Sequence, residues 1–288
     1  MATFKDFRNN VKPNWCPGCG DFSIQAAIQR AAASCGLTPE ELAVISGIGC
    51  SGRISGYIHA YGLHGIHGRA LPIAQGVKLA NRDLTVIATG GDGDGFAIGI
   101  GHTIHAIRRN MNITYIVMDN QIYGLTKGQT SPRSAEGFVT KSTPDGAIES
   151  TLSPLELALS AGATFVAQSF SSDIKQLTAL IEAGIKHEGF SIINVFSPCV
   201  TFNKINTYEW FKENIVNLES FPDYDPSNRV AAMTKLMETG GMITGLIYQD
   251  HSRKCYEDQV PGFQDTPLAH QNLQISRKQF DNLVAEFK

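Results

Sequence analysis

The 288-residue chain carries 24 lysines and arginines against 27 aspartates and glutamates, so its formal net charge is −3, and 42% of its residues are hydrophobic. This balance excludes a strongly basic nucleic-acid-binding protein and suits a globular protein with a sizeable core. The first ten residues, MATFKDFRNN, lack the apolar run of a signal peptide, and no stretch approaches the roughly 18 apolar residues of a membrane helix. We therefore expect a cytoplasmic protein with no membrane or nucleic-acid partner, whose six cysteines are ligands or core thiols rather than disulfides.

The first third of the chain predicts a loop, two helices and one buried strand. Residues 1–20 mix polar residues with prolines and glycines, which is typical of a loop. Asp21 is a candidate N-cap for an alanine-rich amphipathic helix over 21–36. The apolar run 42–49 breaks into glycines, as a buried strand entering a loop would. A second helix is expected over 70–80.

From residue 84 onward, apolar runs alternate with helical patterns. Strands are expected over 84–90 and 112–120, with a helix over 96–109 between them and a long polar loop over 121–152 after them. The remaining elements are a helix at 154–160, a strand at 164–168, a helix at 172–187 and a strand at 190–198. This alternation predicts an α/β fold with an open parallel sheet and helices on both faces.

Past Pro198 the pattern changes. Segments such as TYEWF and FPDYDPSN show no strand–helix–strand alternation. We expect residues 1–200 to form the domain that carries the functional site. Residues 201–288 are expected to form a tail of helices and loops that packs on a partner subunit.

The sequence around GGDG (90–93) predicts a phosphate and metal site. Ligands of open α/β sheets bind beyond the carboxyl ends of the strands. Here glycines would let backbone N–H groups approach phosphate oxygens, and the following helix N-terminus would favour the negative charge. Asp92 would then be an oxygen ligand for Mg²⁺, and Asn120, after the next strand, would supply a second ligand. The main-chain carbonyl of Ile122 would complete the protein's share of the coordination shell.

Two other interpretations of this glycine-rich turn exist. It could merely pack a helix closely against a strand, or it could belong to a nucleotide-binding GxGxxG motif. The second is disfavoured because Asp92 and Asp94 would repel phosphate unless a metal ion intervened. A GDG followed 26 residues later by asparagine, with a strand ahead of each, is the pattern of the thiamine-diphosphate-binding fold.

Four cysteines are expected at the same edge of the sheet: Cys16, Cys19, Cys50 and Cys199. The first two lie in the loop segment WCPGCG, and the other two follow the first and the last predicted strand. Four thiolates suit either a zinc ion or a [4Fe–4S] cluster. One close pair plus two distant single cysteines beside a cofactor favours the redox cluster. Cys35 and Cys255 are interpreted as core or surface thiols.

Six segments together resemble the β subunits of the 2-oxoacid:ferredoxin oxidoreductases. They are WCPGCGD, GIGCSGR, HGRALPIAQGVKLAN, GGDGDGFAIG, DNQIYGLTKGQTSP and SPCVTFN, which lie in the family's order between residues 15 and 203. The resemblance implies that the four cysteines hold a [4Fe–4S] cluster close to thiamine diphosphate. It extends the expected cofactor site to Ser51, His67, Gly91, Asp92, Gly93, Asp94, Asn120, Tyr123, Gly124, Leu125 and Thr126.

The resemblance also implies a reaction and a partner. A 2-oxoacid, CoA and oxidised ferredoxin would give acyl-CoA, CO₂ and reduced ferredoxin. In this family the glutamate that activates the cofactor lies on the α subunit, and only the diphosphate half of the site is recognisable here. We therefore expect the chain to be inactive alone and to form an αβ or (αβ)₂ assembly.

Two cations are candidates for selecting the 2-oxoacid. Arg53 follows Cys50 closely, and Lys127 lies in YGLTKGQ, where pyruvate-specific family members resemble YGLTGGQ. A distal carboxylate would need such a partner, because an unpaired buried charge is costly. We therefore expect 2-oxoglutarate, with pyruvate or a broad range of 2-oxoacids as the alternative. Arg53 and Lys127 could instead serve the diphosphate or the subunit interface, and His67 is expected to orient substrate or cofactor.

Overall fold

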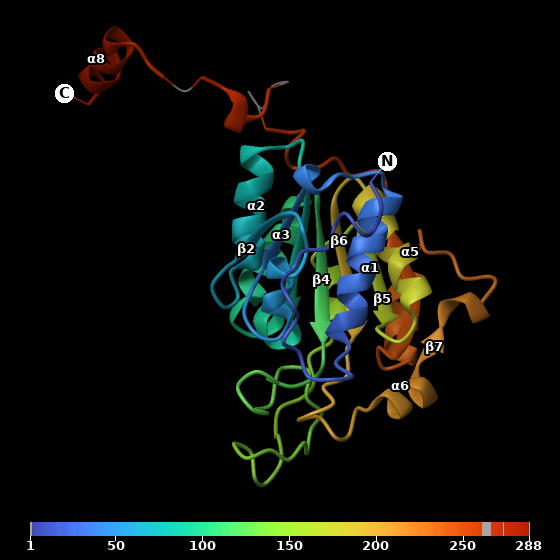
Figure 1. Ribbon diagram of the computed structural model, residues 1–288. Coiled ribbons are helices and arrows are strands. Elements are labelled where there is room, and N and C mark those ends of the chain that lie inside the picture. The colour runs from blue at the N-terminus through green and yellow to red at the C-terminus, as the bar shows by residue number, and fades with distance from the viewer. Residues whose placement is uncertain (1, 261–265, 273, 288) are drawn as a thin grey trace.

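The computed structural model describes residues 2–260, 266–272 and 274–287 (Figure 1). Its strands are β1 Leu42–Ser46, β2 Tyr61–His64, β3 Thr85–Gly91, β4 Ile113–Asp119, β5 Phe165–Phe170, β6 Phe190–Phe196, β7 Val216–Asn217 and β8 Ile243–Gln249. They form one eight-stranded sheet in the order β2-β1-β3-β4-β6-β5-β8-β7. All pairs are parallel except β5 with β8.

Helices cover both faces of this sheet. Their bounds are α1 Asp21–Ser34, α2 Ala70–Ala80, α3 Ile100–Arg109, α4 Pro154–Ser160, α5 Ile174–Lys186, α6 Tyr208–Asn214, α7 Arg229–Glu238 and α8 Arg277–Ala285. Apolar residues of α2, α3, α4 and α7 pack on one face, and those of α1 and α5 pack on the other. Each large apolar side chain buried in this way contributes about 1.5–3 kcal/mol.

The central strands are buried because helices cover both of their faces. All seven residues of β4, ITYIVMD, are buried, as expected for a parallel strand covered on both sides. The register pairs Gly91 of β3 with Met118 of β4, and Asp119 of β4 with Phe196 of β6. The carboxyl ends of these strands therefore meet at one edge, at the lower end of the sheet in Figure 1, where the loop 121–152 extends.

Most elements predicted from the sequence are confirmed, and Asp21 is a correction. It is the first residue of α1, while Gly20 occupies the N-cap position with helical backbone angles. The Asp21 side chain is buried and accepts a hydrogen bond from Ser197 Oγ at 2.8 Å. Its carboxylate thus ties α1 to the segment after β6 instead of capping the helix.

The description of the tail as helices and loops is wrong for two segments, β7 and β8, which pair with each other in parallel. β8 adds to the main sheet, antiparallel to β5, with a register shift between Val166 and Ala167. Ile243 and Ile247 lie in the same apolar core as α4 and α7. The expected packing of the tail on a partner subunit stays a prediction.

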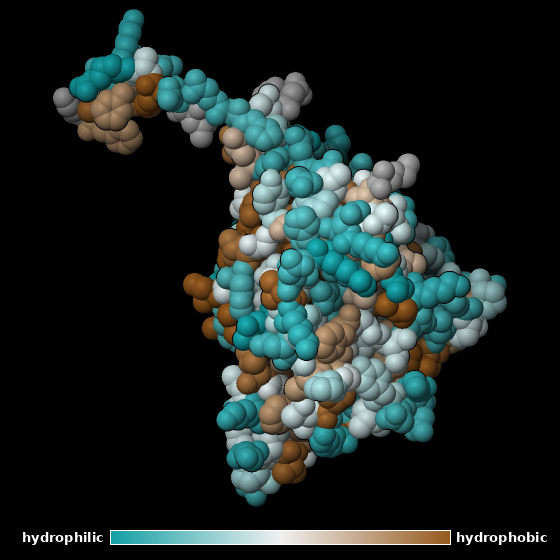
Figure 2. Space-filling view, viewed as in Figure 1, coloured by the Kyte–Doolittle hydropathy of each residue, from teal (hydrophilic) through white to brown (hydrophobic). Residues whose placement is uncertain are grey.

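β2 was also missed, because its four residues, YGLH, are all exposed and show no apolar alternation. It pairs only with β1 and forms the edge of the sheet. Leu63 is 41% exposed and the nearby Ile66 is 73% exposed. Figure 2 shows hydrophobic surface on the side where β2 lies in Figure 1.

Helix α8 lies apart from the rest of the molecule in Figure 1, and none of its residues is buried. Across the described residues, no helix combines the length and the apolar composition that crossing a bilayer requires.

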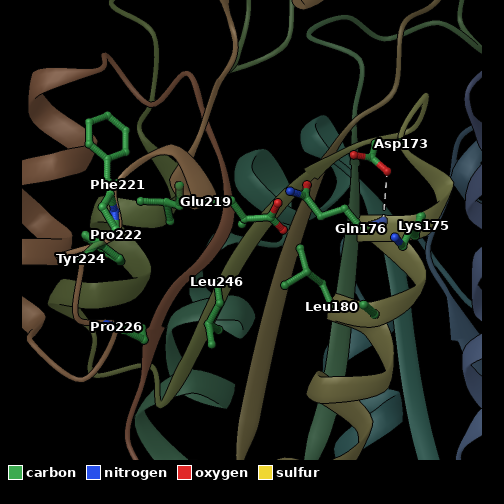
Figure 3. Close-up of a pocket in the computed structure, with 13 residues that line it drawn as sticks. Asp173, Lys175, Gln176, Leu180, Glu219, Phe221, Pro222, Tyr224, Pro226 and Leu246 are labelled. Atoms are coloured by element: carbon green, nitrogen blue, oxygen red, sulfur yellow. Dashed lines mark hydrogen bonds between the residues drawn. The ribbon is translucent and has the colours of Figure 1, made fainter.

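A cavity of about 730 Å³ lies between α5, β8 and the segment 218–226 (Figure 3). Lys175 and Gln176 line it on the side of α5, and Phe221 and Tyr224 line the opposite side. Asp173 belongs to its wall, but its carboxylate caps α5 by accepting a hydrogen bond from Gln176 N at 3.0 Å. None of the residues predicted for the functional site lines this cavity.

Candidate functional site

A cavity of about 200 Å³ lies at the carboxyl ends of β1, β3 and β4. Its lining consists of Ile48, Gly49, Cys50, Ser51, His67, Gly91, Asp92, Gly93, Asp94, Asn120, Ile122, Tyr123, Gly124, Leu125 and Thr126. Every residue predicted to contact thiamine diphosphate is in this lining. The fold therefore brings these residues together from four separate segments, while their individual roles stay predictions.

Asp92 directly follows β3 and is a buried carboxyl group with 1% exposure. Ser131 Oγ donates a hydrogen bond to it. Burial, followed by the nearby charge of Asp119, raises the pKa of Asp92 to about 8. Because a buried carboxylate is costly without a compensating charge, a cation at this position would favour the ionised form. The carboxylate and amide oxygens present here are ligands that Mg²⁺ prefers, so the residues fit a magnesium ion.

The other two predicted magnesium ligands, Asn120 and Ile122, lie in a tight turn after β4. Asn120 Oδ1 accepts a hydrogen bond from Ile122 N at 3.1 Å, and Asn203 Nδ2 donates to Asn120 O at 3.1 Å. Gln121, between them, has a left-handed backbone with φ of 59°. This conformation costs a non-glycine residue about 1–2 kcal/mol, and such strain is common at functional sites. The turn keeps Asn120 and Ile122 close together.

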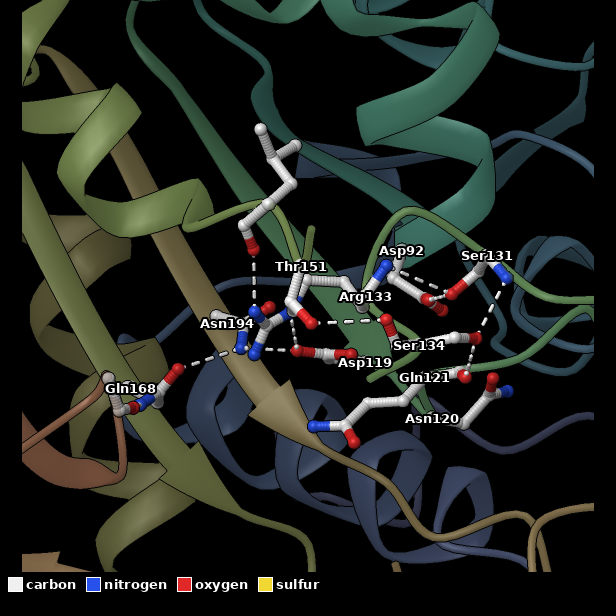
Figure 4. A network of polar contacts seen from close by, with 12 residues as sticks. Asp92, Asp119, Asn120, Gln121, Ser131, Arg133, Ser134, Thr151, Gln168 and Asn194 are labelled. Carbon is white, nitrogen blue, oxygen red and sulfur yellow. Dashed lines mark hydrogen bonds and ion pairs between the residues drawn. The ribbon is translucent and has the colours of Figure 1, made fainter. Parts of the chain in front are cut away.

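A buried polar network lies next to this turn (Figure 4). The carboxylate of Asp119 accepts hydrogen bonds from Arg133 Nε at 2.9 Å and Asn194 Nδ2 at 3.1 Å. Asn194 Nδ2 also donates to Gln168 Oε1 at 2.8 Å, and Gln168 Nε2 donates to Ile243 O at 2.6 Å. The network therefore connects the turn after β4 to the start of β8.

The loop 131–134 joins the network to Asp92. Besides bonding Asp92, Ser131 Oγ accepts a hydrogen bond from Arg133 N at 3.2 Å. Ser134 Oγ accepts from Ser131 N at 2.9 Å and donates to Gln121 O at 2.7 Å. Sequence reasoning missed the residues of this network. The signal for two of them was weak: Gln168 and Asn194 are the single amide side chains of β5 and β6, which are buried and mostly apolar.

Two polar side chains of the cavity, Ser51 and Asp94, differ in their hydrogen bonding. Ser51 Oγ is buried and has no hydrogen-bond partner among the residues that the structure describes. It is therefore available to a bound ligand, since buried hydroxyl groups are normally paired. The Asp94 carboxylate, in contrast, already accepts a hydrogen bond from His67 Nδ1 at 2.8 Å.

The four predicted cluster cysteines come from three separate segments that meet beside the cavity. Cys16 and Cys19 form a turn in which Cys19 N donates to Cys16 O at 3.0 Å. A Cβ atom built on Gly124 would lie 3.3 Å from Cys199 Sγ and 3.9 Å from Cys50 Sγ. The same atom would lie 4.0 Å from the side-chain nitrogen of Asn120. Two of the cysteine thiols and the side chain of the predicted metal ligand Asn120 are thus all neighbours of Gly124.

Burial keeps two of these thiols neutral. It raises the pKa of Cys50 to about 12 and raises that of Cys19 still further, with the nearby Asp21 as the second cause in both cases. Burial also raises the pKa of Asp21, to about 6. Because thiolates are the form that binds metal, a cationic metal centre would compensate for the charge that the thiols otherwise cannot hold.

The distinction between zinc and a [4Fe–4S] cluster is not decided by the geometry of these cysteines. Across residues 2–260, 266–272 and 274–287, no group of three histidine, cysteine, aspartate or glutamate side chains lies close enough to share one ion. Four thiolates suit either centre, so the cluster stays a prediction.

Arg53 and Lys127 lie outside the cavity lining. Arg53 is exposed on the short 3₁₀ helix Ser51–Gly56, and Lys127 is exposed in a left-handed conformation with φ of 77°. Neither forms an ion pair with a carboxylate in the described parts of the chain. Both cations are therefore available to a ligand or a partner, and their predicted roles remain untested.

Comparison with known proteins gives a consistent result. The family model "Thiamine pyrophosphate enzyme, C-terminal TPP binding domain" matches residues 47–195, and a second family model, for the C-terminal region of the pyruvate ferredoxin oxidoreductase β subunit, matches residues 199–265. The chain is 40% identical to 2-oxoacid:ferredoxin oxidoreductase 2, subunit beta, of Aeropyrum pernix, over 96% of the chain and 94% of that protein. It is 47% identical to 2-oxoglutarate oxidoreductase subunit KorB of Mycobacterium tuberculosis, over 69% of the chain and 53% of that protein.

A solved structure is similar over nearly the whole chain. It is the 2-oxoglutarate:ferredoxin oxidoreductase from Magnetococcus marinus with 2-oxoglutarate, coenzyme A and succinyl-CoA bound. The TM-score is 0.88 at 39% sequence identity, with 98% of this chain and 96% of that chain covered. These matches extend past residue 200, so they include the segment that contributes β8.

Proposed function

The chain belongs to the β subunits of the 2-oxoacid:ferredoxin oxidoreductases, and on that basis we propose that it supplies a magnesium–thiamine-diphosphate half-site and a [4Fe–4S] cluster to an enzyme that acts on 2-oxoglutarate. The predicted family and α/β fold class are confirmed, and the oxidoreductase class and the thiamine-diphosphate-binding domain follow from membership. The metal, the cluster, the substrate and the partner are the proposal. One observation carries it: a single built atom, Cβ on Gly124, would lie within 4.0 Å of the thiols of Cys50 and Cys199 and of the side chain of Asn120, so the predicted cluster ligands and a predicted magnesium ligand are neighbours.

The proposed magnesium ligands are Asp92, Asn120 and the carbonyl of Ile122. The cofactor's diphosphate would lie against the backbone around Gly91 and Gly93. A Cβ atom on Gly93 would lie 2.2 Å from the ring of Tyr123, so this position has no room for a side chain, whereas one on Gly91 would lie at an ordinary contact distance of 3.4 Å from Ser51 Oγ. The absence of side chains at both positions would leave backbone N–H groups accessible to phosphate oxygens.

In the proposed reaction, 2-oxoglutarate, CoA and oxidised ferredoxin give succinyl-CoA, CO₂ and reduced ferredoxin. Bound thiamine diphosphate supplies an electron sink for the decarboxylation, and the cluster supplies single-electron transfer to ferredoxin. The residues of this chain would contribute by positioning the two bound groups. Asp92 and Asn120 would hold the diphosphate end, while Cys50 and Cys199, whose thiols lie within 4.0 Å of a Cβ atom built on Gly124, would hold the cluster that carries the electrons away.

The α subunit is proposed to supply the activating glutamate. The expected result is that the purified chain releases no CO₂ from 2-oxoglutarate, whereas the complex co-purified anaerobically with its α subunit does. The measurement is CO₂ release from 1-labelled 2-oxoglutarate with CoA and an electron acceptor. Turnover by the chain alone would contradict the half-site proposal.

Lys127 is proposed to select the 2-oxoacid. Its ammonium group is exposed beside the cavity segment 122–126, so it can pair with the distal carboxylate that 2-oxoglutarate has and pyruvate lacks. Replacing Lys127 by alanine is expected to lower the ratio of 2-oxoglutarate to pyruvate kcat/KM by about 10-fold or more, the value of a charge-assisted hydrogen bond of about 1.5–3 kcal/mol. The measurement is kcat/KM of the αβ complex with both acids.

A matched control is Lys141→Ala, which removes another exposed lysine of the loop 121–152 that does not line the cavity. This control is expected to leave the ratio unchanged. An unchanged ratio in Lys127→Ala would contradict the assignment and favour pyruvate or a broad range of 2-oxoacids.

A further inference from the structure

The carboxylate of Asp94 joins three segments of the cofactor cavity. Its Oδ1 accepts hydrogen bonds from Ile48 N at 2.9 Å, Gly68 N at 2.8 Å and His67 Nδ1 at 2.8 Å. These donors lie in the loop after β1 and in the loop before α2, and Asp94 itself begins the helical turn Asp94–Ile98 after β3. The side chain is only 3% exposed. One oxygen atom therefore sets the relative position of all three segments.

The surrounding glycines leave space for this carboxylate. A Cβ atom on Gly47 would lie 1.9 Å from Asp94 Oδ2, and one on Gly90 would lie 2.9 Å from it. A side chain at Gly47 would therefore displace Asp94, and one at Gly90 would meet both Asp94 and the hydroxyl group of Tyr115, which would lie 2.7 Å away. These two glycines are thus explained by the packing around Asp94.

The bond to Asp94 decides which ring nitrogen of His67 is free. A carboxylate partner places the proton on Nδ1 and fixes the orientation of the imidazole. His67 lines the cavity together with Asp92 and Asn120, and its side chain is 36% exposed. The ring of Tyr123 lies edge-on at 6.1 Å. With Nδ1 occupied, Nε2 is the nitrogen that remains for a ligand in the cavity.

We propose that Asp94 is a positioning residue that holds His67 with Nδ1 turned inward, so that Nε2 is presented to the diphosphate of the bound cofactor. This inference rests on the proposed function, since it takes thiamine diphosphate as the ligand. It assigns Asp94 no contact with the cofactor, although the residue lies inside the phosphate-binding motif. Besides its bonds to Ile48 N and Gly68 N, Asp94 acts on binding through His67.

A double-mutant cycle on the αβ complex tests this inference. Cofactor-free complexes of wild type, Asp94→Ala, His67→Ala and the double variant are titrated with thiamine diphosphate and Mg²⁺ by calorimetry. Each single variant is expected to bind about 10-fold more weakly, as is typical when a supporting partner of a ligand-binding histidine is lost. The double variant is expected to bind clearly more tightly than the product of the two single losses predicts, because the part of the Asp94 effect that passes through His67 is already lost. A role in folding only would make the two losses multiply to about 100-fold.

Asp94→Asn keeps an oxygen acceptor and replaces Asp94→Ala in the cycle if the alanine variant does not fold. Its smaller loss of affinity is also expected to shrink in the His67→Ala background. Multiplying losses, or an unchanged affinity in Asp94→Ala, would overturn the inference.

The variant Asp92→Asn shows whether a negative result overturns only this inference or also the proposed function. If Asp92→Asn binds the cofactor as tightly as wild type does, the proposed half-site is wrong. If Asp92→Asn loses cofactor binding while the affinity losses of Asp94→Ala and His67→Ala multiply, only the positioning role of Asp94 is wrong.

Discussion

Replacing Arg133 by methionine is expected to lower the free energy of unfolding of the cofactor-free chain by about 3–5 kcal/mol, because it leaves a buried charge without its partner. Asp119 is fully buried, and Arg133 is 10% exposed over its side chain. Their bond of 2.9 Å is the ion pair of the network shown in Figure 4. Arg133 also donates to Leu152 O at 2.6 Å, so its loss frees the loop 121–152 as well. The measurement is urea unfolding followed by circular dichroism.

Two further variants test whether that loss of stability comes from the unpaired buried charge. Arg82→Met removes the exposed ion pair with Asp258, so it is expected to cost no more than about 1 kcal/mol. Combining Arg133→Met with Asp119→Asn removes both charges and is expected to restore part of the stability, since the uncompensated carboxylate is then gone. If Arg133→Met costs no more than Arg82→Met, the buried pair does not order this loop.

Asp92→Asn is expected to weaken binding of Mg²⁺ and thiamine diphosphate by about 100-fold, because the charged ligand of the metal is lost. The same change is expected to leave the free chain as stable as wild type or more stable. Burial raises the pKa of Asp92 from 3.8 to about 8, so the folded chain keeps a proton that the unfolded chain releases. Wild-type stability therefore falls as pH rises from about 4 to about 8 through this group, and asparagine has no such proton to keep.

The measurement is thermal unfolding of both proteins at about pH 5 and about pH 8, with and without the cofactor. Without the cofactor, the difference in Tm between Asp92→Asn and wild type is expected to be larger at the higher pH. With the cofactor, only wild type is expected to gain stability. A stabilising effect of the cofactor on Asp92→Asn equal to that on wild type would contradict the assignment of Asp92 as the metal ligand.

The residues that line the cavity were predictable because strand order and strand ends can be inferred from apolar runs. Asp92 and Asn120 follow such runs directly, and parallel strands bring their carboxyl ends to one edge. Cys50 and Cys199 were placed by the same logic. The family resemblance supplied what spacing left open, which is the preference for iron over zinc.

The supporting residues were not predictable in the same way. Arg133 lies in a polar loop with no periodic pattern, and its partner Asp119 is reached only through the fold. β8 was missed because glycine interrupts its apolar run, ITGLIYQ, at Gly245, whose φ is 125°. The bonds that Asp94 Oδ1 accepts from His67 and two backbone groups were likewise not predictable from its place in the glycine-rich motif, and its predicted contact with the cofactor stays a prediction. In each case the role of the residue or segment depends on contacts with residues distant in the sequence, and a local sequence pattern does not predict such contacts.

Metal analysis and electron paramagnetic resonance of the anaerobically purified αβ complex test the central claim, that a redox cluster lies beside the thiamine-diphosphate half-site. The β chain is expected to contribute about four iron atoms and four acid-labile sulfides, with a signal of a reduced [4Fe–4S] cluster that disappears in Cys199→Ser. The reduced signal is also expected to change when thiamine diphosphate binds to wild type and to stay constant in Asp92→Asn. One zinc ion with no iron bound to these cysteines, or an iron signal retained in Cys199→Ser, would contradict the account.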